Sequence, residues 1–310
     1  MTINAHPELP DFEYIRPASL SEASRFLAEH AGEARPLLGG TDIFVRMRDG
    51  FWRDKYLVDV KNLNGTSELK FRETGDESGP AGLTVGAAVN MNRVMLDAKV
   101  CERYLLLSEA CRSVASYQLR TRATIAGNIC NASPAGDTIG ACLVLKAVLK
   151  IHGVNGYREE PLSSFFRGPG KTILQPGDIV TSVFFPLPPM KSAGTYIKLG
   201  RNTWSDLSIV GVTAYGYSVS KEQSTSQKSD GFNFRLALAS VAPVPLIPDA
   251  AQEFLGDNEP GPEVFKQAAQ MAADACTPID DVRVSARYRK AMVRNLTERS
   301  LLMTWEKLNR

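Results

Sequence analysis

The sequence predicts an α+β protein, because strand and helix patterns first alternate and later separate along the chain. Residues 12–47 read as a strand, a helix, a second strand and a glycine turn, followed by a helix or a further strand. Strand-like runs at 56–60, 69–74 and 82–89 precede a helical stretch at 91–121. Beyond residue 195, strand patterns come before helices that begin near Pro248.

Length and composition exclude several classes of protein. The chain has 310 residues and a net charge of +2, with no long basic run, so neither a nucleic-acid partner nor an anionic membrane is indicated. The N-terminus has no signal-peptide pattern, and Lys146 and Lys150 interrupt the most apolar helical stretch. We therefore expect a cytoplasmic protein without a membrane span.

The five cysteines are scattered, without a CxxC pair or a Cys/His cluster. This spacing predicts no zinc or iron–sulfur site within the chain and favours buried, reduced thiols. Familiar nucleotide motifs also fail. No GxGxxG follows a strand, and "GPGKT" at 168–172 lacks the first glycine of a P-loop, so we interpret it as a turn.

Two glycine-containing segments remain, "LLGGTDI" at 37–43 and "ATIAGNI" at 123–129. Each follows an apolar run and places a small polar residue directly after a glycine. Consecutive backbone N–H groups in such a turn form a concavity that binds anions. Either segment alone is equally typical of a tight loop, but two of them facing each other could hold a diphosphate.

The order of these segments, together with several later motifs, resembles a known family. Residues 38–42 match its A-G-G-T-D/H loop, 124–128 its T-I-G-G-N loop, and 128–137 its N-x-x-x-A-S-P-x-x-D continuation. Further matches lie at 165–179, 196–210, 235–246 and 281–289. The chain is similar to the FAD-binding medium subunit of molybdenum hydroxylases, the group of xanthine dehydrogenase and aerobic carbon monoxide dehydrogenase.

The resemblance implies a domain organisation. An FAD-binding domain of the PCMH or vanillyl-alcohol-oxidase type would span 1–187, as two α/β subdomains at about 1–58 and 59–187. A C-terminal α/β domain at 188–310, with an antiparallel sheet and helices, would cover the flavin. "PLPPMKSAG" at 186–194 is the expected linker, and the polar "SKEQSTSQKSDG" at 220–231 is an expected hairpin loop.

The resemblance also implies the site residues. Asp137 would contact the ribityl or ribose region, Val180 would pack near the isoalloxazine, and Lys198 would approach its polar edge. Attachment would be non-covalent, since no histidine lies in a glycine loop. The two loops would grip the pyrophosphate through Leu37, Leu38, Gly39, Gly40, Thr41, Asp42, Ile43, Thr124, Ile125, Ala126, Gly127 and Asn128.

Alternative interpretations of the later residues stay open at this point. Asp137 could cap a helix that begins near Thr138, and Val180 could be ordinary strand core. Lys198, Arg201 and Asp206 could form a surface ion-pair set. Arg201 and Asp206 could also fix the loop that carries "NTWS".

As a function, the resemblance implies one flavoprotein component of a larger oxidoreductase. A large partner subunit would carry the molybdenum cofactor, and a small partner subunit would carry two [2Fe–2S] clusters. This chain's FAD would take electrons from those clusters and pass them to an external acceptor that the sequence does not identify. The alternatives are a stand-alone FAD-dependent oxidase or dehydrogenase of the same superfamily and a scaffold that has lost its flavin.

Ala126 departs from the family pattern, in which a glycine stands at this position. Glycine serves either a left-handed torsion or a close backbone approach. We expect Ala126 to keep a negative φ with its methyl group turned into the core, and Gly127 alone to supply the unusual torsion.

Overall fold

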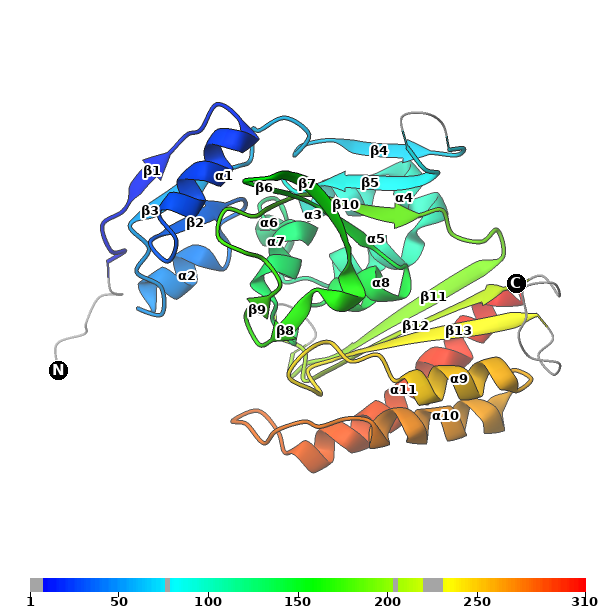
Figure 1. Cartoon of the computed structure of the whole chain (residues 1–310). Coiled ribbons are helices and arrows are strands. Elements are labelled where there is room, and N and C mark those ends of the chain that lie inside the picture. Colours follow the sequence, from blue (N-terminus) through cyan, green and yellow to red (C-terminus); the bar gives the residue numbers. More distant parts are fainter. Residues whose placement is uncertain (1–7, 76–78, 203–205, 220–230) are drawn as a thin grey trace.

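The computed structural model describes residues 8–75, 79–202, 206–219 and 231–310. The chain is built as three units, each centred on one β-sheet (Figure 1). The α+β class agrees with the sequence prediction. The "SKEQSTSQKSDG" segment lies outside the described residues except for Gly231.

The N-terminal unit is a small parallel sheet in the order β1-β3-β2, flanked by two helices. Helix α1 begins after Ser19, whose side chain accepts a hydrogen bond from the backbone N–H of Glu22, as expected for a helix cap. The predicted subdomain boundary at about residue 58 falls within the third strand. The elements are β1 (Glu13–Ile15), α1 (Leu20–Glu29), β2 (Ala34–Leu37), α2 (Ile43–Arg48) and β3 (Tyr56–Asp59).

The middle unit is a five-stranded antiparallel sheet in the order β4-β5-β10-β6-β7. Its strands are β4 (Leu69–Arg72), β5 (Gly82–Gly86), β6 (Val148–Gly153), β7 (Gly156–Pro161) and β10 (Ile179–Pro186). The helices that pack on it are α3 (Met91–Leu96), α4 (Ala98–Arg103), α5 (Leu105–Arg112), α6 (Tyr117–Arg120), α7 (Ile125–Asn131) and α8 (Ile139–Val144).

The single helical stretch predicted at 91–121 is divided into four helices. Asp97 ends α3 in an extended conformation and caps α4, accepting bonds from two backbone N–H groups of its first turn. A second break lies at Tyr104, between α4 and α5, and a third follows α5, where Ala115 has a φ of 39°. These breaks fold the stretch back on itself, so that several short helices cover one face of the sheet.

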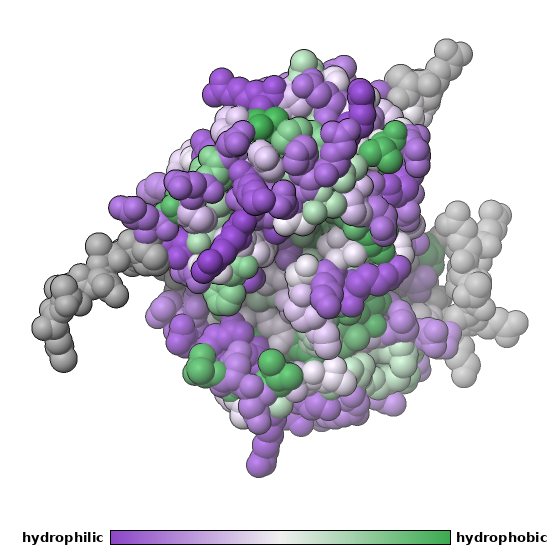
Figure 2. Space-filling view, turned by 60° about the vertical axis from the view of Figure 1, so that its left-hand side comes forward, coloured by the Kyte–Doolittle hydropathy of each residue, from purple (hydrophilic) through white to green (hydrophobic). Residues whose placement is uncertain are grey.

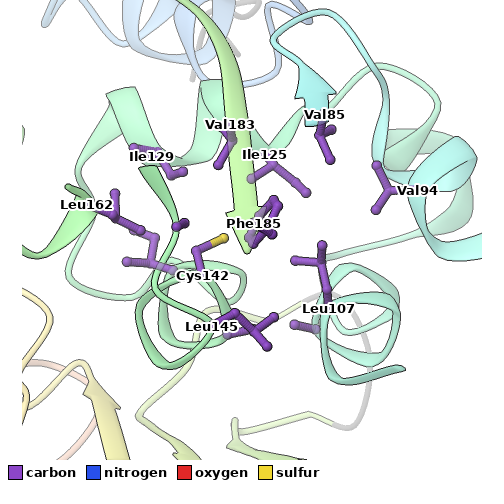
Figure 3. Packing of buried hydrophobic residues seen from close by; sticks show 14 of the residues in the cluster. Val85, Val94, Leu107, Ile125, Ile129, Cys142, Leu145, Leu162, Val183 and Phe185 are labelled. Carbon is purple, nitrogen blue, oxygen red and sulfur yellow. The ribbon is translucent and has the colours of Figure 1, made fainter. Parts of the chain in front are cut away.

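The core of the middle unit lies between these helices and the central strand β10. Figure 3 shows Ile125 and Ile129 of α7 pointing into the same cluster as Val183 and Phe185 of β10. All four are at most 1% exposed. Helix α7 is therefore anchored by its apolar side, and this anchoring fixes the orientation of its opposite side.

The "GPGKT" segment is the turn that the sequence predicts, between two short antiparallel strands. These are β8 (Phe166–Gly168) and β9 (Lys171–Thr172), which follow a short 3-10 helix, η1 (Leu162–Ser164). The amide of Gly170 donates to the carbonyl of Ala132, 3.0 Å away, at the end of α7. The turn is thereby held against the middle unit.

The C-terminal unit is an antiparallel sheet in the order β11-β12-β13, covered on both faces. Helices α9 to α11 lie on one face, while α5 and α8 of the middle unit pack against the other (Figure 1). The predicted division at 187/188 falls between β10 and the first strand of this unit. Its elements are β11 (Ser192–Leu199), β12 (Val210–Ser218), β13 (Phe232–Ala239), α9 (Asp249–Asp257), α10 (Pro262–Asp274) and α11 (Ala286–Leu308).

A charged cluster holds the start of α11 to this sheet. Arg289 is 2% exposed and donates to the carbonyl oxygens of Ile209 and Ser240. Its remaining terminal nitrogen lies 2.7 Å from a carboxylate oxygen of Asp281, which Arg283 also contacts at 2.8 Å. Burial alone would raise the pKa of Asp281, but hydrogen bonds donated by Arg283 and by nearby backbone amides lower it well below its usual range.

The C-terminal unit is joined to the middle unit through residues 132–137. The backbone N–H of Ser240 donates to the carbonyl of Pro134 at 2.7 Å, and the Ser208 hydroxyl donates to that of Ala135 at 3.3 Å. Ser240 has a φ of 66°, a conformation that only surrounding contacts of this kind maintain.

The face shown in Figure 2 is mostly hydrophilic, with small hydrophobic groups, and is hollowed near its centre. None of the described helices is long and apolar enough to span a membrane.

Replacing Asp281 with alanine should lower the free energy of unfolding by about 2–3 kcal/mol, because it leaves the Arg289 guanidinium buried without a counter-charge. A carboxylate with a lowered native pKa stabilises the fold above its unfolded pKa of about 4. The wild-type advantage should therefore be present at neutral pH and disappear as the pH falls through the native pKa. Urea unfolding at several pH values measures this, with Glu253→Ala, an exposed carboxylate on α9, as the control. Equal stability of the two variants at pH 7 would contradict it.

Candidate functional site

A cavity of about 390 Å³ lies between the N-terminal and middle units, a volume typical of small-molecule sites. Four segments form its walls: the loop between β2 and α2, one side of α7, the β8–β9 turn and the chain that leads into β10. Most of the predicted site residues line it, namely Leu38, Gly39, Gly40, Thr41, Asp42, Ile43, Thr124, Gly127, Asn128 and Val180.

The two glycines of the first loop are each required by geometry. A Cβ at Gly39 would lie 2.1 Å from the backbone carbonyl oxygen of Arg122, so only glycine permits this approach of the two chain segments. Gly40 has a φ of 74°, and a Cβ there would meet the ring of Phe44 at 2.6 Å. The first loop is therefore a bare backbone turn against the start of the second segment.

The second segment is not the glycine turn that we predicted. It is the first turn of α7, which begins after Thr124, whose hydroxyl accepts from the Gly127 N–H at 2.9 Å. Gly127 does not have a positive φ, so the prediction that it supplies an unusual torsion is wrong. Ala126 also lacks a positive φ and is 2% exposed, as we expected for a methyl group in the core.

Helical periodicity sorts this segment into two faces. Thr124, Gly127, Asn128 and Asn131 recur at intervals of three and four residues and line the cavity. The other face packs into the core and carries Ile125, Ala126 and Ile129. Ile125 and Ala126, like Leu37 at the end of β2, are thus predicted site residues whose side chains are buried away from the cavity.

Asp137 and Lys198, the other two predicted residues, pair with each other instead of lining the cavity. Lys198 Nζ lies 2.7 Å from Asp137 Oδ2, and the Tyr196 hydroxyl donates to Asp137 Oδ1 at 2.7 Å. The same ammonium donates to the carbonyl of Ser113 at 3.3 Å, next to the cavity residue Val114. The carboxylate of Asp137 makes no helix-capping bond, which removes that alternative.

Burial controls the protonation of this cluster. It raises the pKa of Asp137, opposed by Lys198 and Tyr196, and raises the pKa of Tyr196 well above its usual value. The hydroxyl of Tyr196 therefore remains a donor throughout the physiological range. Lys198 and Asp137 are 16% and 9% exposed, so this pair is partly desolvated and not the surface pair of the alternative interpretation.

Arg201 and Asp206 lie apart from the cavity lining. One Asp206 oxygen accepts from the backbone N–H groups of Arg201, at 2.6 Å, and Asn202, at 3.4 Å. The pair thus shapes the approach to "NTWS", whose remaining residues lie outside the described part of the chain.

Several cavity residues were missed by the sequence reasoning. Gly170 and Thr172 belong to the "GPGKT" turn, whose glycines were a signal that we assigned to the turn alone. At another part of the wall, the Arg35 guanidinium lies 3.8 Å from the centre of the Trp52 ring and 2.9 Å from Asp54. The sequence could not predict the contacts of Arg35 with Trp52 and Asp54, because these residues meet only when β2 pairs with β3.

The arrangement fits a ligand with an anionic group and apolar parts. A bare glycine loop and a helix start present backbone groups to one region of the cavity, whereas Met91, Val114, Leu119 and Val180 line other parts of it. A Cβ at Gly127 would have only the Thr124 hydroxyl within 4 Å, so this side of α7 is open to close approach.

Comparison with known proteins agrees with this geometry. Residues 10–188 match the family of FAD binding domains in molybdopterin dehydrogenase, and residues 195–304 match the CO dehydrogenase flavoprotein C-terminal domain. The chain belongs to this family of flavoprotein subunits.

Individual relatives match over nearly the whole chain. The carbon monoxide dehydrogenase medium chain of Hydrogenophaga pseudoflava is 30% identical over 96% of this chain and 98% of its own length. A putative xanthine dehydrogenase FAD-binding subunit of Escherichia coli (strain K12) is 28% identical over 92% and 93%. A structure of carbon monoxide dehydrogenase from H. pseudoflava superposes with a TM-score of 0.87 at 27% identity, covering 97% of this chain and 99% of that one.

Gly39→Ala should weaken FAD binding at least tenfold and lower the unfolding free energy by about 1–3 kcal/mol, since the new methyl group forces the two cavity walls apart. Fluorescence titration of the FAD-free protein and urea unfolding measure the two effects. Gly75→Ala is the matched control, because its Cβ would meet Ala81 at an ordinary 3.5 Å. An unchanged FAD affinity in Gly39→Ala would show that this approach does not shape the site.

Ala126→Gly should leave FAD affinity within about twofold of wild type, because position 126 faces the core. It should lower the unfolding free energy by about 1–2 kcal/mol, through the poorer helix propensity of glycine and the loss of a buried methyl group. The same two measurements apply. FAD binding tightened tenfold, about 1.4 kcal/mol, would mean that the alanine methyl group obstructs the cofactor.

Proposed function

We propose that this chain is the FAD-carrying electron-transfer subunit of a multi-subunit molybdenum hydroxylase. It would take electrons from the [2Fe–2S] clusters of a small partner subunit and deliver them to an external acceptor. A large partner subunit with the molybdenum cofactor would carry out the substrate chemistry.

The observation that carries the proposal is the cavity between the N-terminal and middle units, whose walls include Gly39, Gly40 and Gly127. The relatives that match the chain from end to end include a medium chain and an FAD-binding subunit of dehydrogenases, which supports a component role over a self-contained oxidase. The five cysteines are all free thiols, in keeping with a reducing, cytoplasmic location.

The roles of the cavity residues follow from their positions. The backbone of the first loop, Gly39 to Asp42, and the start of α7 would hold the diphosphate of FAD. Val180, at the end of the cavity-lining chain that enters β10, would pack beside the isoalloxazine. When bound, FAD accepts electrons one at a time and releases them in pairs, and the protein's part is to position and tune it.

Lys198 and Asp137 would act at the polar edge of the flavin. Asp137 and the Ser113 carbonyl hold the ammonium next to the cavity wall at Val114. A fixed positive charge there stabilises negative charge that develops on the cofactor. Asp137 is thus a positioning residue for Lys198, with Tyr196 fixing the carboxylate in turn.

The test is affinity purification of the tagged chain from its own organism, followed by flavin and metal analysis and mass spectrometry of the partners. We expect flavin, iron and molybdenum to co-purify with two further polypeptides. A flavin-containing chain that oxidises a substrate without partners would support the stand-alone oxidase instead. A chain without flavin would overturn the proposal.

In the same complex, Lys198→Met should lower the flavin midpoint potential by about 30 mV or more, which for a two-electron couple is about 1.4 kcal/mol. Asp137 keeps the hydrogen bond from the Tyr196 hydroxyl in this variant, so the carboxylate does not lose all its partners. Lys266→Met, which removes an exposed charge on α10, is the control. An unchanged potential in Lys198→Met would exclude this tuning role.

A further inference from the structure

Among the described residues, two hydrogen bonds join the N-terminal unit, residues 8–59, to residues 79–202. The Ser24 hydroxyl donates to the carbonyl of Gly177 at 2.7 Å, and the Asn131 side-chain amide donates to Asp42 Oδ1 at 3.0 Å. Gly177, Asp42 and Asn131 all line the cavity, so both bonds lie at its boundary.

The two bonds differ in their exposure to water. Ser24 is 0% exposed, whereas Asp42 is exposed and Asn131 is half-buried. A buried hydrogen bond is costly to break because its groups are left unsatisfied, but one in contact with water can exchange partners. Separation of the two units would therefore begin at Asp42 and Asn131 and leave the Ser24 side in place.

Asp42 is also placed unusually for a residue at the start of a helix. It stands at the N-cap of α2, where an aspartate side chain ordinarily caps the helix, yet it makes no capping bond. Its carboxylate instead crosses to Asn131, at the far end of the cavity-facing side of α7. A carboxylate beside a diphosphate repels it, so attraction for the cofactor does not explain this position.

We propose that Asp42 and Asn131 form a clasp that retains FAD by holding the first loop against α7 at the exposed rim of the cavity. This inference rests on the proposed function, because FAD is the ligand that the clasp retains. The clasp controls how fast the cofactor leaves, while the glycine backbone and the cavity lining provide its binding surface.

The test is a double-mutant cycle on the rate of FAD release. The purified complex is diluted into flavin-free buffer, and the rise in free-flavin fluorescence is followed for wild type, Asp42→Ala, Asn131→Ala and the double variant. Each single variant should release FAD roughly fivefold to tenfold faster, as expected for loss of one charge-assisted hydrogen bond. The double variant should be no faster than the faster single variant, because both changes break the same bond.

Two further variants separate the clasp from a charge effect. Asp42→Asn keeps an acceptor for the Asn131 amide but makes the bond a weaker, neutral one, so it should release FAD more slowly than Asp42→Ala and closer to the wild-type rate. Asp49→Ala, which removes an exposed carboxylate at the other end of α2, should resemble wild type. Slower release in both Asp42→Ala and Asp42→Asn would show that Asp42 acts by repulsion, and would overturn the clasp.

The remaining outcomes are also decisive. Additive effects in the double variant, or wild-type release rates in both single variants, overturn the clasp. The proposed function would still stand, because the wild-type complex would release flavin and therefore contain it. A wild-type complex without flavin overturns both. Thermal unfolding of each variant checks its fold, and Asp42→Asn, as the near-isosteric change, tests the inference even where an alanine variant is unstable.

Discussion

The site depends on the close contact between the backbone of Gly39 and the carbonyl of Arg122. Arg122 stands two residues before the cap of α7, so the contact fixes the first loop relative to the start of that helix. A side chain of any size at position 39 would separate the two segments, because its Cβ would fall 2.1 Å from a backbone oxygen. The close approach of these two walls of the cavity therefore requires glycine at position 39.

The C-terminal unit is attached to the middle unit through the segment that directly follows α7, so its position depends on where α7 lies. Residues 132–137 accept hydrogen bonds from Ser240 and Ser208 and carry Asp137, which pairs with Lys198 of β11. The charged cluster around Asp281 holds α11 and the carbonyls of Ile209 and Ser240 in one place. Packing in the C-terminal unit is thus transmitted to the Lys198 ammonium, although none of the described residues of this unit lines the cavity.

Sequence patterns were sufficient for the α+β class, for most element types and for the first glycine loop. They failed where long-range packing decides the local structure. "TIAGN" contains a glycine and an asparagine, which are typical of a turn, but burial of Ile125 and Ile129 against β10 makes it a helix. The buried face of α11 cannot be recognised from an apolar pattern in the sequence either, because its buried residues include Arg289, Thr297 and Thr304.

The sequence also did not predict which side chains from distant segments pair with each other. Asp137 and Lys198 are both site residues implied by the family resemblance, yet nothing in their spacing of 61 residues shows that they bind each other. The bond between Asp42 and Asn131 spans 89 residues and includes a residue that the resemblance does not single out. Once α7 is known to be a helix, however, Asn131 follows from Thr124, Gly127 and Asn128 by simple periodicity.

That periodicity also explains why an alanine is tolerated where the family pattern has glycine. In a turn, two adjacent glycines would both face the ligand, and a methyl group on either would reduce the space for it. In a helix, adjacent residues are about 100° apart around the axis, so Ala126 faces the core while Gly127 faces the cavity. In the proposed FAD site, the second glycine of the motif would allow close approach of the cofactor, whereas the first faces the core and can be replaced by a residue that the core accommodates. At 2% exposure, with Ile125 and Ile129 beside it on the same face, position 126 favours a small apolar side chain over none.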